Sequence, residues 1–396
     1  MQHENPRAFR DPLLYACTHC TTFDPQCEDA RAPYLWALID LTGEPMFYRD
    51  GLLAALDTVD NELYWGQIFD LSATFVEQGD TALKPAMYRC FERWGYAETG
   101  LSCAEVLVRL DGLDALRAVM KTFEAEPAED RPWQFGHLLE ILRKRDGHYA
   151  LPPELDRFTN EWRAHEAQLE VERDRPDPPR ETWQAIRQTL SDRQFGRKVA
   201  WIRSASSEEV RHAADALTEE SGHSQLLNLL RLFEWRDFPG SPAPLLALAG
   251  ASDTTIARRA LTALARLKGP EIRAAAMKAI AQPALRRGAI ECLAANPETG
   301  DYRLLESLLR QDLNDEELHA VSIGARHYIE ANPAPEAERT LLLLYENTPC
   351  SMCRYTPVKK LLELGRLPSS IREECCYDAD EDTRTLVKGP STDAGD

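Results

Sequence analysis

The chain has 396 residues, of which 43% are hydrophobic and 28% charged, and its formal net charge is −19. This composition is typical of a folded globular protein and excludes a disordered or membrane-embedded chain. The acidic balance also argues against a general nucleic-acid binder, because affinity for phosphate backbones depends on clustered Lys and Arg.

The first residues, MQHENPRAFRDPLLYAC, are polar and include acidic residues, whereas a secretory signal has basic residues followed by an apolar block. No apolar run approaches the roughly 18 residues that a membrane span needs. We therefore expect a cytoplasmic protein without membrane contact. In that compartment the ten cysteines of the chain are expected to be free thiols.

Helical patterns dominate the first part of the chain. Apolar residues recur at helical spacing in residues 29–43, 61–80 and 81–95, and each of these segments ends at or next to a glycine. Links of a few residues between such helices are typical of antiparallel helical hairpins. We find no alternating β-branched run that would predict a strand.

A charged, proline-rich stretch, EVERDRPDPPRETW, follows at residues 170–183. Proline cannot continue a helix, and charged, proline-rich segments tend to be exposed to solvent. The sequence therefore predicts a helical array over residues 1–170, a linker over 171–182, and a second helical array over 183–396 that ends in a short acidic tail. One continuous array with an irregular link would give the same pattern.

Short alanine- and leucine-rich helices alternate in the second half, at residues 256–269, 272–282, 285–296 and 302–311. Small residues allow antiparallel helices to approach closely, and each pair leaves an apolar face that the next pair covers. Over roughly residues 205–330 the sequence resembles HEAT-like repeats, in particular the short, alanine-rich variety of the phycobilisome-lyase type. The resemblance implies an all-α fold of stacked antiparallel helical hairpins forming an α-solenoid, in one or two arrays.

The stretch TPCSMCRYTPVKKLLELG, residues 348–365, places a Cys-x-x-Cys pair at an expected helix start. Thr348 is suited to cap the helix and Pro349 to its first position, so that Cys350 and Cys353 fall in the first turns. There the helix dipole favours thiolate. The pair is open to three interpretations: packed thiols, a metal site or a redox pair.

Cys375 and Cys376 lie near the end of the next expected helix, so that an antiparallel hairpin directs four sulfurs, with Cys350 and Cys353, toward a zinc site. The two arms of the hairpin differ in length by roughly 6 Å at about 1.5 Å per residue, which counts against such a site. A second candidate zinc set is Cys17, Cys20 and Cys27. It lacks a fourth ligand at the usual spacing unless a nearby histidine serves.

Two further patterns favour ordinary helix surfaces. The acidic segment YDADEDTR, residues 377–384, lacks the glycine and the terminal glutamate of a calcium loop, and therefore reads as an acidic helix start. Glu316 and His319 form a single Glu-x-x-His without the second copy that a di-iron centre needs, and therefore read as a solvated helix face.

Aromatic residues at expected helix ends provide candidate partner-binding positions. Tryptophan and arginine dominate binding hot spots because they bury a large area at low entropic cost. The alternative is that these tryptophans fill gaps between hairpins. The candidates are Trp65, Trp94, Trp133, Trp235 and Arg236.

The function expected from these features is a non-enzymatic scaffold that binds another protein on the concave face of an α-solenoid. No nucleotide-binding, zinc-protease or nucleophile-elbow motif is present in the sequence. One alternative, implied by the repeat resemblance, is a lyase-like modifying enzyme. Another is nucleic-acid binding through a local basic face within residues 193–287, formed by Arg258, Arg259, Arg266, Arg273, Arg286 and Arg287.

Overall fold

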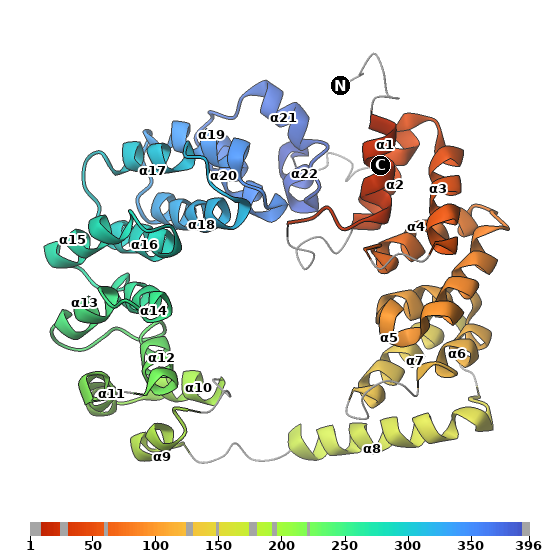
Figure 1. Ribbon diagram of the computed structural model, residues 1–396, viewed down its shortest axis with the longest axis horizontal. Coiled ribbons are helices and arrows are strands. Elements are labelled where there is room, and N and C mark those ends of the chain that lie inside the picture. Colours follow the sequence, from red (N-terminus) through yellow and green to blue (C-terminus); the bar gives the residue numbers. More distant parts are fainter. Residues whose placement is uncertain are drawn as a thin grey trace, which may run out of the picture. The chain divides into compact units, whose positions relative to one another are not determined.

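The computed structural model describes residues 9–23, 31–58, 62–123, 130–147, 150–173, 180–191, 196–219 and 222–389. Every regular element in these ranges is a helix, and helices that follow one another along the chain pack together (Figure 1). The predicted all-α class is thereby confirmed. None of the described helices combines the length and apolar character that crossing a bilayer requires.

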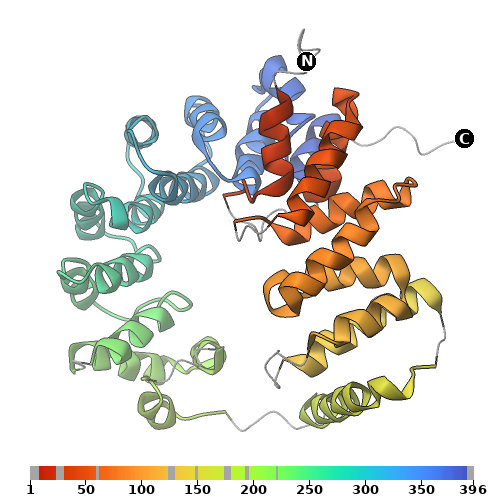
Figure 2. The ribbon, with the colours of Figure 1, turned by 45° about the vertical axis from the view of Figure 1, so that its right-hand side comes forward.

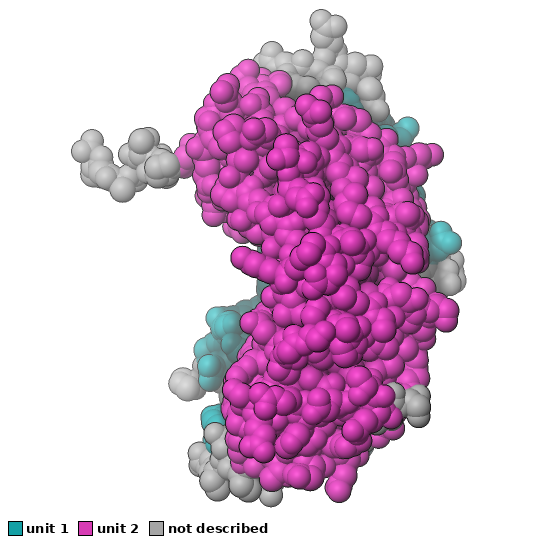
Figure 3. All heavy atoms as spheres, turned by 90° about the vertical axis from the view of Figure 1, so that its left-hand side faces the viewer, with its two compact units in different colours: residues 1–177 teal, residues 178–396 magenta. Residues whose placement is uncertain are grey.

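The chain divides into two compact units, residues 1–177 and residues 178–396, which we name unit 1 and unit 2 (Figure 3). Each unit has its own apolar core. The core of unit 1 includes Phe69, Leu107 and Phe135, and the main core of unit 2 includes Leu261 and Ile290. None of the core clusters formed by the described residues contains members of both units.

Unit 1 consists of eight described α-helices and one short 3₁₀ turn. Helix α4 packs against α5, α5 packs against α6 and α7, and α7 packs against α8, while α1 contacts α2, α3 and α4. The helices are α1 (Arg10–Thr18), α2 (Arg31–Thr42), α3 (Pro45–Asp57), α4 (Trp65–Glu77), α5 (Leu83–Asp111), α6 (Leu113–Met120), α7 (Arg131–Asp146), η4 (Pro153–Leu155) and α8 (Asp156–Arg173).

Helix α5 is interrupted at two glycines. Gly95 has a φ of 72° and Gly100 a φ of 73°, values in the left-handed region that favours glycine. The helix end predicted at Gly95 is therefore a real break in helical backbone, but the chain resumes helical geometry beyond it and continues to Asp111.

Unit 2 contains fourteen described α-helices and one 3₁₀ turn. They are α9 (Trp183–Gln188), α10 (Gly196–Ser204), α11 (Ser207–Glu219), α12 (His223–Leu232), α13 (Ala243–Ala249), α14 (Thr254–Leu264), α15 (Pro270–Ala279), η5 (Pro283–Leu285), α16 (Arg286–Ala295), α17 (Asp301–Leu309), α18 (Asp315–Ala331), α19 (Ala337–Asn347), α20 (Ser351–Glu363), α21 (Ser369–Cys375) and α22 (Glu381–Lys388).

The helices of unit 2 form two rows. In one row α12 packs on α14, α14 on α16, α16 on α18, α18 on α20 and α20 on α22. In the other row α13 packs on α15 and α17 on α19, and each of these helices also contacts its successor in the chain. The rows are visible in Figures 1 and 2. Each hairpin therefore covers the apolar face of its neighbour, as the alanine-rich sequence predicts.

Small residues bring the helices of the first row close together. A Cβ atom on Gly324 of α18 would lie 3.0 Å from the Cβ of Ile290 in α16, and one on Gly288 would lie 3.0 Å from the Cβ of Leu261 in α14. Side-chain caps define several helix starts: Asp253 accepts from the N–H groups of Thr255 and Ile256 at the start of α14.

The predicted linker begins too early by a few residues. Helix α8 continues through Arg173, so positions 171–173 are helical, and Thr182 caps α9 by accepting from the N–H of Ala185. Val171 and Arg173 lie at the end of a helix with a polar surface. They therefore show no apolar spacing that would have predicted their helical conformation. Residues 174–179 lie outside the described ranges.

Candidate metal centre and exposed aromatic surfaces

Two neighbouring helices of the first row in unit 2 place the Cys-x-x-Cys pair beside a histidine. Helix α18 begins after Asn314, whose side-chain oxygen accepts from the N–H of Glu317 at 2.9 Å, so that His319 falls in the second turn. Helix α20 begins at Ser351, with Cys350 in the N-cap position.

The predicted capping arrangement at this helix is wrong by two residues. Thr348 closes the preceding helix instead, because its N–H donates to the carbonyl of Leu344 at 3.0 Å. The chain therefore turns between the two helices at Pro349, and the first residue available to cap α20 is Cys350. The sulfur of Cys350 consequently lies at the helix start rather than one position inside it.

His319, Cys350 and Cys353 form a cluster that we name the Cys/His centre. One ligand atom from each residue lies within 4.8 Å of the other two. The Nε2 of His319 is 3.3 Å from the Sγ of Cys353. Cys350 is buried, whereas His319 and Cys353 are partly exposed. The centre is therefore reached from solvent on one side and closed by protein on the other.

Thiolate is the favoured form of Cys350. The hydrogen bond with the Cys353 side chain is the largest cause, and it lowers the pKa of Cys350 to about 6. The N–H groups of Met352 and Cys353 and the nearby His319 side chain act in the same direction, while burial opposes them. A thiolate, an adjacent thiol and an imidazole can bind a soft metal ion, or the two sulfurs can form a disulfide.

The structure does not bring Cys375 and Cys376 into this centre. Cys375 ends α21 and its thiol faces Tyr345, with an Sγ to Oη distance of 3.7 Å, in a small core that also contains Val358 and Val387. Cys376 donates to the carbonyl of Arg372. The four-sulfur arrangement is therefore not the one observed among the described residues.

The N-terminal cysteines do not form a cluster either. Cys17 is fully buried in the core of unit 1, and burial raises its pKa to about 12. Cys20 is exposed, with its sulfur 3.1 Å from the hydroxyl of Thr22. Cys27 lies outside the described residues. Among the described residues, Cys17 and Cys20 belong to no group with metal-ligand geometry.

The sequence pattern assigned His319 to a solvated helix face and therefore missed its proximity to Cys353 and Cys350. Its partner lies 34 residues away, and only the packing of α18 on α20 brings the two together. The signal that could have found it is the alternation of packed helices: in a two-row stack, each helix neighbours the helix two positions later in the chain. The acidic segment behaves as predicted, since Asp380 caps α22.

Two of the four tryptophan candidates are packing residues. Trp65 is buried in the core of unit 1, and its ring centroid is 5.9 Å from that of Trp94, which is itself packed against that core. Trp133 and Trp235 are different, with 59% and 46% of their surface exposed. Exposure to that extent leaves their indole faces available to a partner.

Trp235 is held in place by a cation. The guanidinium of Arg203 lies 4.4 Å from the ring centroid, and Arg236 donates to the backbone carbonyl of Arg203 at 3.2 Å. The indole follows α12 in unit 2. A cation against one face fixes the ring while its other side remains available, which lowers the entropy lost on binding.

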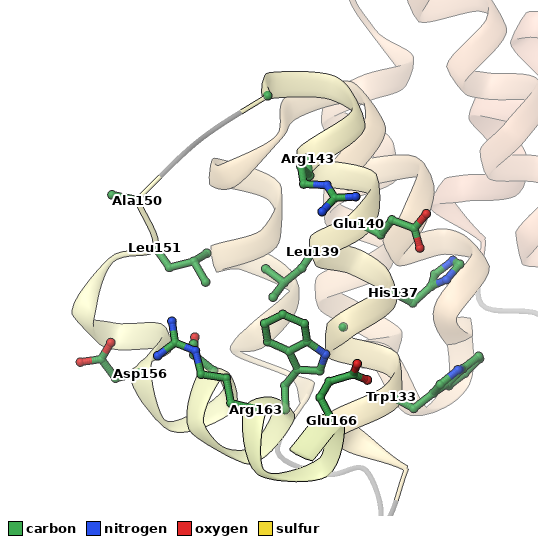
Figure 4. A pocket seen from close by; sticks show the side chains of 14 residues that line it. Trp133, His137, Leu139, Glu140, Arg143, Ala150, Leu151, Asp156, Arg163 and Glu166 are labelled. Atoms are coloured by element: carbon green, nitrogen blue, oxygen red, sulfur yellow. The ribbon is translucent and has the colours of Figure 1, made fainter. Parts of the chain in front are cut away.

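Trp133 stands at the rim of a cavity of about 720 Å³ between α7 and α8. Figure 4 shows His137, Glu140 and Arg143 along α7, with Arg163 and Glu166 opposite them on α8. A Cβ on Gly136 would lie 2.6 Å from the indole nitrogen of Trp162, so glycine makes room for that ring. The lining combines charged side chains of both signs with aromatic and aliphatic ones, so it suits an amphipathic chain segment.

The six arginines of the expected basic face are mostly compensated. Four form ion pairs with carboxylates: Arg259 with Glu234, Arg266 with Asp237, Arg273 with Asp301 and Arg287 with Glu291. Arg286 is buried and donates to the Ile280 carbonyl and the Gln311 side chain, and Arg258 is exposed. These six arginines therefore do not form a continuous uncompensated basic surface.

Compared with protein-family models, curated proteins and solved structures, the chain has no significant match. The fold is that of an all-helical protein in which helix pairs that follow one another in the sequence pack together.

Proposed function

We propose that this chain is a protein-binding scaffold built as an α-solenoid. The two-row packing of α12 to α22 supports the solenoid architecture, because each hairpin packs on its neighbours in the chain. Such stacks present long surfaces to which another chain can bind along several helices.

The observation that carries the proposal is the exposure of Trp133 and Trp235 on fixed positions. Hot spots for protein binding are enriched in tryptophan and arginine. Each of these two has a polar neighbour that fixes it, His137 for Trp133 and Arg203 for Trp235. With a net charge of −19, the chain favours a neutral or basic partner.

The test is a comparison of partner recovery by wild-type protein and by the variants Trp133→Ala and Trp235→Ala. We expect a protein recovered in a fixed ratio with the wild type to be lost or weakened at least about tenfold by one of the variants, as hot-spot truncation typically does. Met277→Ala is the matched control, since Met277 is 44% exposed but has no aromatic face. Equal recovery by all four proteins would contradict the proposal.

The two alternative functions receive less support. Nucleic-acid binding needs an uncompensated basic surface, and the arginines between 258 and 287 are mostly paired with carboxylates or buried. A lyase-like activity needs an apolar cleft with a titratable group, and the cavity between α7 and α8 is lined by a mixture of charged and apolar side chains.

A further inference from the structure

The Cys/His centre has the donor atoms of a metal site. It combines two sulfurs from one helix start with an imidazole nitrogen from the adjacent helix. We propose that His319, Cys350 and Cys353 bind one Zn²⁺ ion per chain, with a fourth coordination position open to water or to a ligand from a partner. The proposal is independent of the scaffold function.

The spacing of the three donor atoms fits tetrahedral zinc. Bond lengths of about 2.3 Å to sulfur and about 2.05 Å to nitrogen imply edges of about 3.8 Å between two sulfurs and about 3.5 Å between sulfur and nitrogen. The observed Nε2 to Sγ distance between His319 and Cys353 is 3.3 Å, and all three atoms lie within 4.8 Å of one another. Binding therefore requires shifts of about 1 Å or less, which rotation of side chains on fixed helices supplies.

The charges also fit. Cysteine ligands bind zinc as thiolates, so two of them neutralise the charge of a divalent cation. Mixed thiolate and imidazole donors suit zinc rather than magnesium or calcium, which prefer oxygen. Among these donors, cysteine sulfur distinguishes zinc most strongly from magnesium and calcium.

The fourth position faces the accessible side of the centre. Cys350 is 4% exposed, whereas His319 and Cys353 are partly exposed, so an ion held between them has its open vertex toward solvent. The nearest sulfurs in sequence do not complete the site, since Cys375 is hydrogen-bonded to Tyr345 and Cys376 to a backbone carbonyl. Three protein ligands and one exchangeable position define an open zinc site.

The primary experiment uses the full chain, reduced and freed of metal by a chelator, and adds Co²⁺ as a spectroscopic probe. We expect thiolate-to-cobalt charge-transfer bands together with the intense visible bands of tetrahedral Co²⁺, saturating at one ion per chain. Zn²⁺ should displace the cobalt and remove both sets of bands. Native mass spectrometry of the protein as purified should show the mass of one zinc ion.

Variants then locate the site. Cys350→Ser and Cys353→Ser should each weaken zinc binding by more than the roughly 10- to 100-fold that changes outside the ligand set cost. His319→Gln should do the same, although it keeps a side chain able to hydrogen-bond to Cys353. Cys376→Ser and Cys20→Ser are matched controls that should bind as the wild type does. Circular dichroism establishes that each variant is folded.

Three outcomes would overturn the proposal. One is a reduced, folded wild-type chain that binds neither Co²⁺ nor Zn²⁺. Another is binding that survives all three ligand substitutions, which would place the ion elsewhere. The third is rapid conversion of the metal-free wild type to a Cys350–Cys353 disulfide together with no metal affinity, which would assign the pair to thiol chemistry instead.

Discussion

Individual cysteines in this chain have opposite chemical character, although all of the described ones are free thiols. Cys350 sits at a helix start beside a thiol and an imidazole, and its pKa is lowered to about 6. Cys17 and Cys292 are enclosed by apolar side chains, and desolvation raises the pKa of each to about 12. The surroundings, and not the residue type, decide which sulfur is reactive.

Burial of neutral thiols makes stability depend on pH in a defined direction. A thiol that remains neutral in the folded state up to about pH 12 holds its proton after the unfolded chain has lost it, from about pH 8.5 upward. The unfolded state then binds fewer protons than the folded state, so stability decreases as pH rises above that point. For one such cysteine the loss between about pH 8 and pH 10 is about 2 kcal/mol.

Cys292 tests this prediction in unit 2, where its thiol donates to the carbonyl of Leu261 at 3.2 Å. Cys292→Ala should lower stability at about pH 8 through lost packing, yet it should lose about 2 kcal/mol less than the wild type on going to about pH 10. Urea unfolding at the two pH values measures the difference. An identical loss in both proteins would show that this thiol does not remain neutral in the fold.

At the scale of helices, a buried ion-pair network connects three elements of unit 2. The carboxylate of Asp301, which is 3% exposed, accepts from both terminal nitrogens of Arg273 at 2.6 and 2.9 Å. It also accepts from the hydroxyl of Tyr328 and from the N–H of Glu298. One side chain thereby fixes the start of α17 against α15 and α18.

Removing that carboxylate should destabilise unit 2 strongly. Asp301→Ala leaves Arg273 and two hydrogen-bond donors without their buried acceptor, and we expect a loss of about 3–5 kcal/mol in urea unfolding. Glu298→Ala is the control, because Glu298 also pairs with Arg273 but its side chain is 66% exposed. Its loss should be within about 1 kcal/mol. Comparable losses for the two variants would contradict this account.

The contact between α16 and α18 depends on the absence of a side chain. Alanine ordinarily stabilises a helix relative to glycine by about 1 kcal/mol, but a methyl group on Gly324 would lie 3.0 Å from the Cβ of Ile290 and 3.3 Å from the Arg287 carbonyl. We therefore expect Gly324→Ala to destabilise unit 2 by about 1–3 kcal/mol, measured by urea unfolding. A gain in stability would show that the helices separate at no cost.

A control for this substitution lies on the same helix. The hydroxyl of Ser322 is buried and has no hydrogen-bond partner in the described part of the chain. Ser322→Ala removes an unsatisfied polar group without adding volume, and it should leave the stability unchanged or raise it.

On the scale of the whole molecule, the two units have separate cores: the core of unit 1 consists of residues between Cys17 and Phe158, and the main core of unit 2 of residues between Trp183 and Leu361. Separate cores favour separate unfolding transitions, because each core is formed by residues of one unit only. The Cys/His centre lies entirely in unit 2.

Zinc should therefore act on one transition only. At a free concentration about 100 times the dissociation constant, a bound ion stabilises the folded state by about 2.7 kcal/mol. Calorimetry of the full chain should show two transitions, of which only that of unit 2 moves upward with zinc. Cys353→Ser should abolish the shift. Equal movement of both transitions, or a single transition, would contradict the independence of the two units.

The sequence by itself determined the helical class and much of the helix pattern. Alanine and leucine at helical spacing predict α14 to α17 within a few residues, since a helix buries the apolar stripe that this spacing creates. The break at Gly95 was also predictable, because glycine adopts the left-handed backbone that interrupts a helix more readily than other residues do.

Only the tertiary structure decided which chemistry-bearing residues meet. Cys350 and Cys353 are close in sequence, but the third member of their cluster, His319, comes from a different helix, while Cys375 turns to Tyr345 instead. Likewise, nothing in the neighbouring sequence distinguishes the buried Trp65 from the exposed Trp235. Helix formation depends on interactions over a few residues, whereas these contacts depend on how helices far apart in the chain pack against one another.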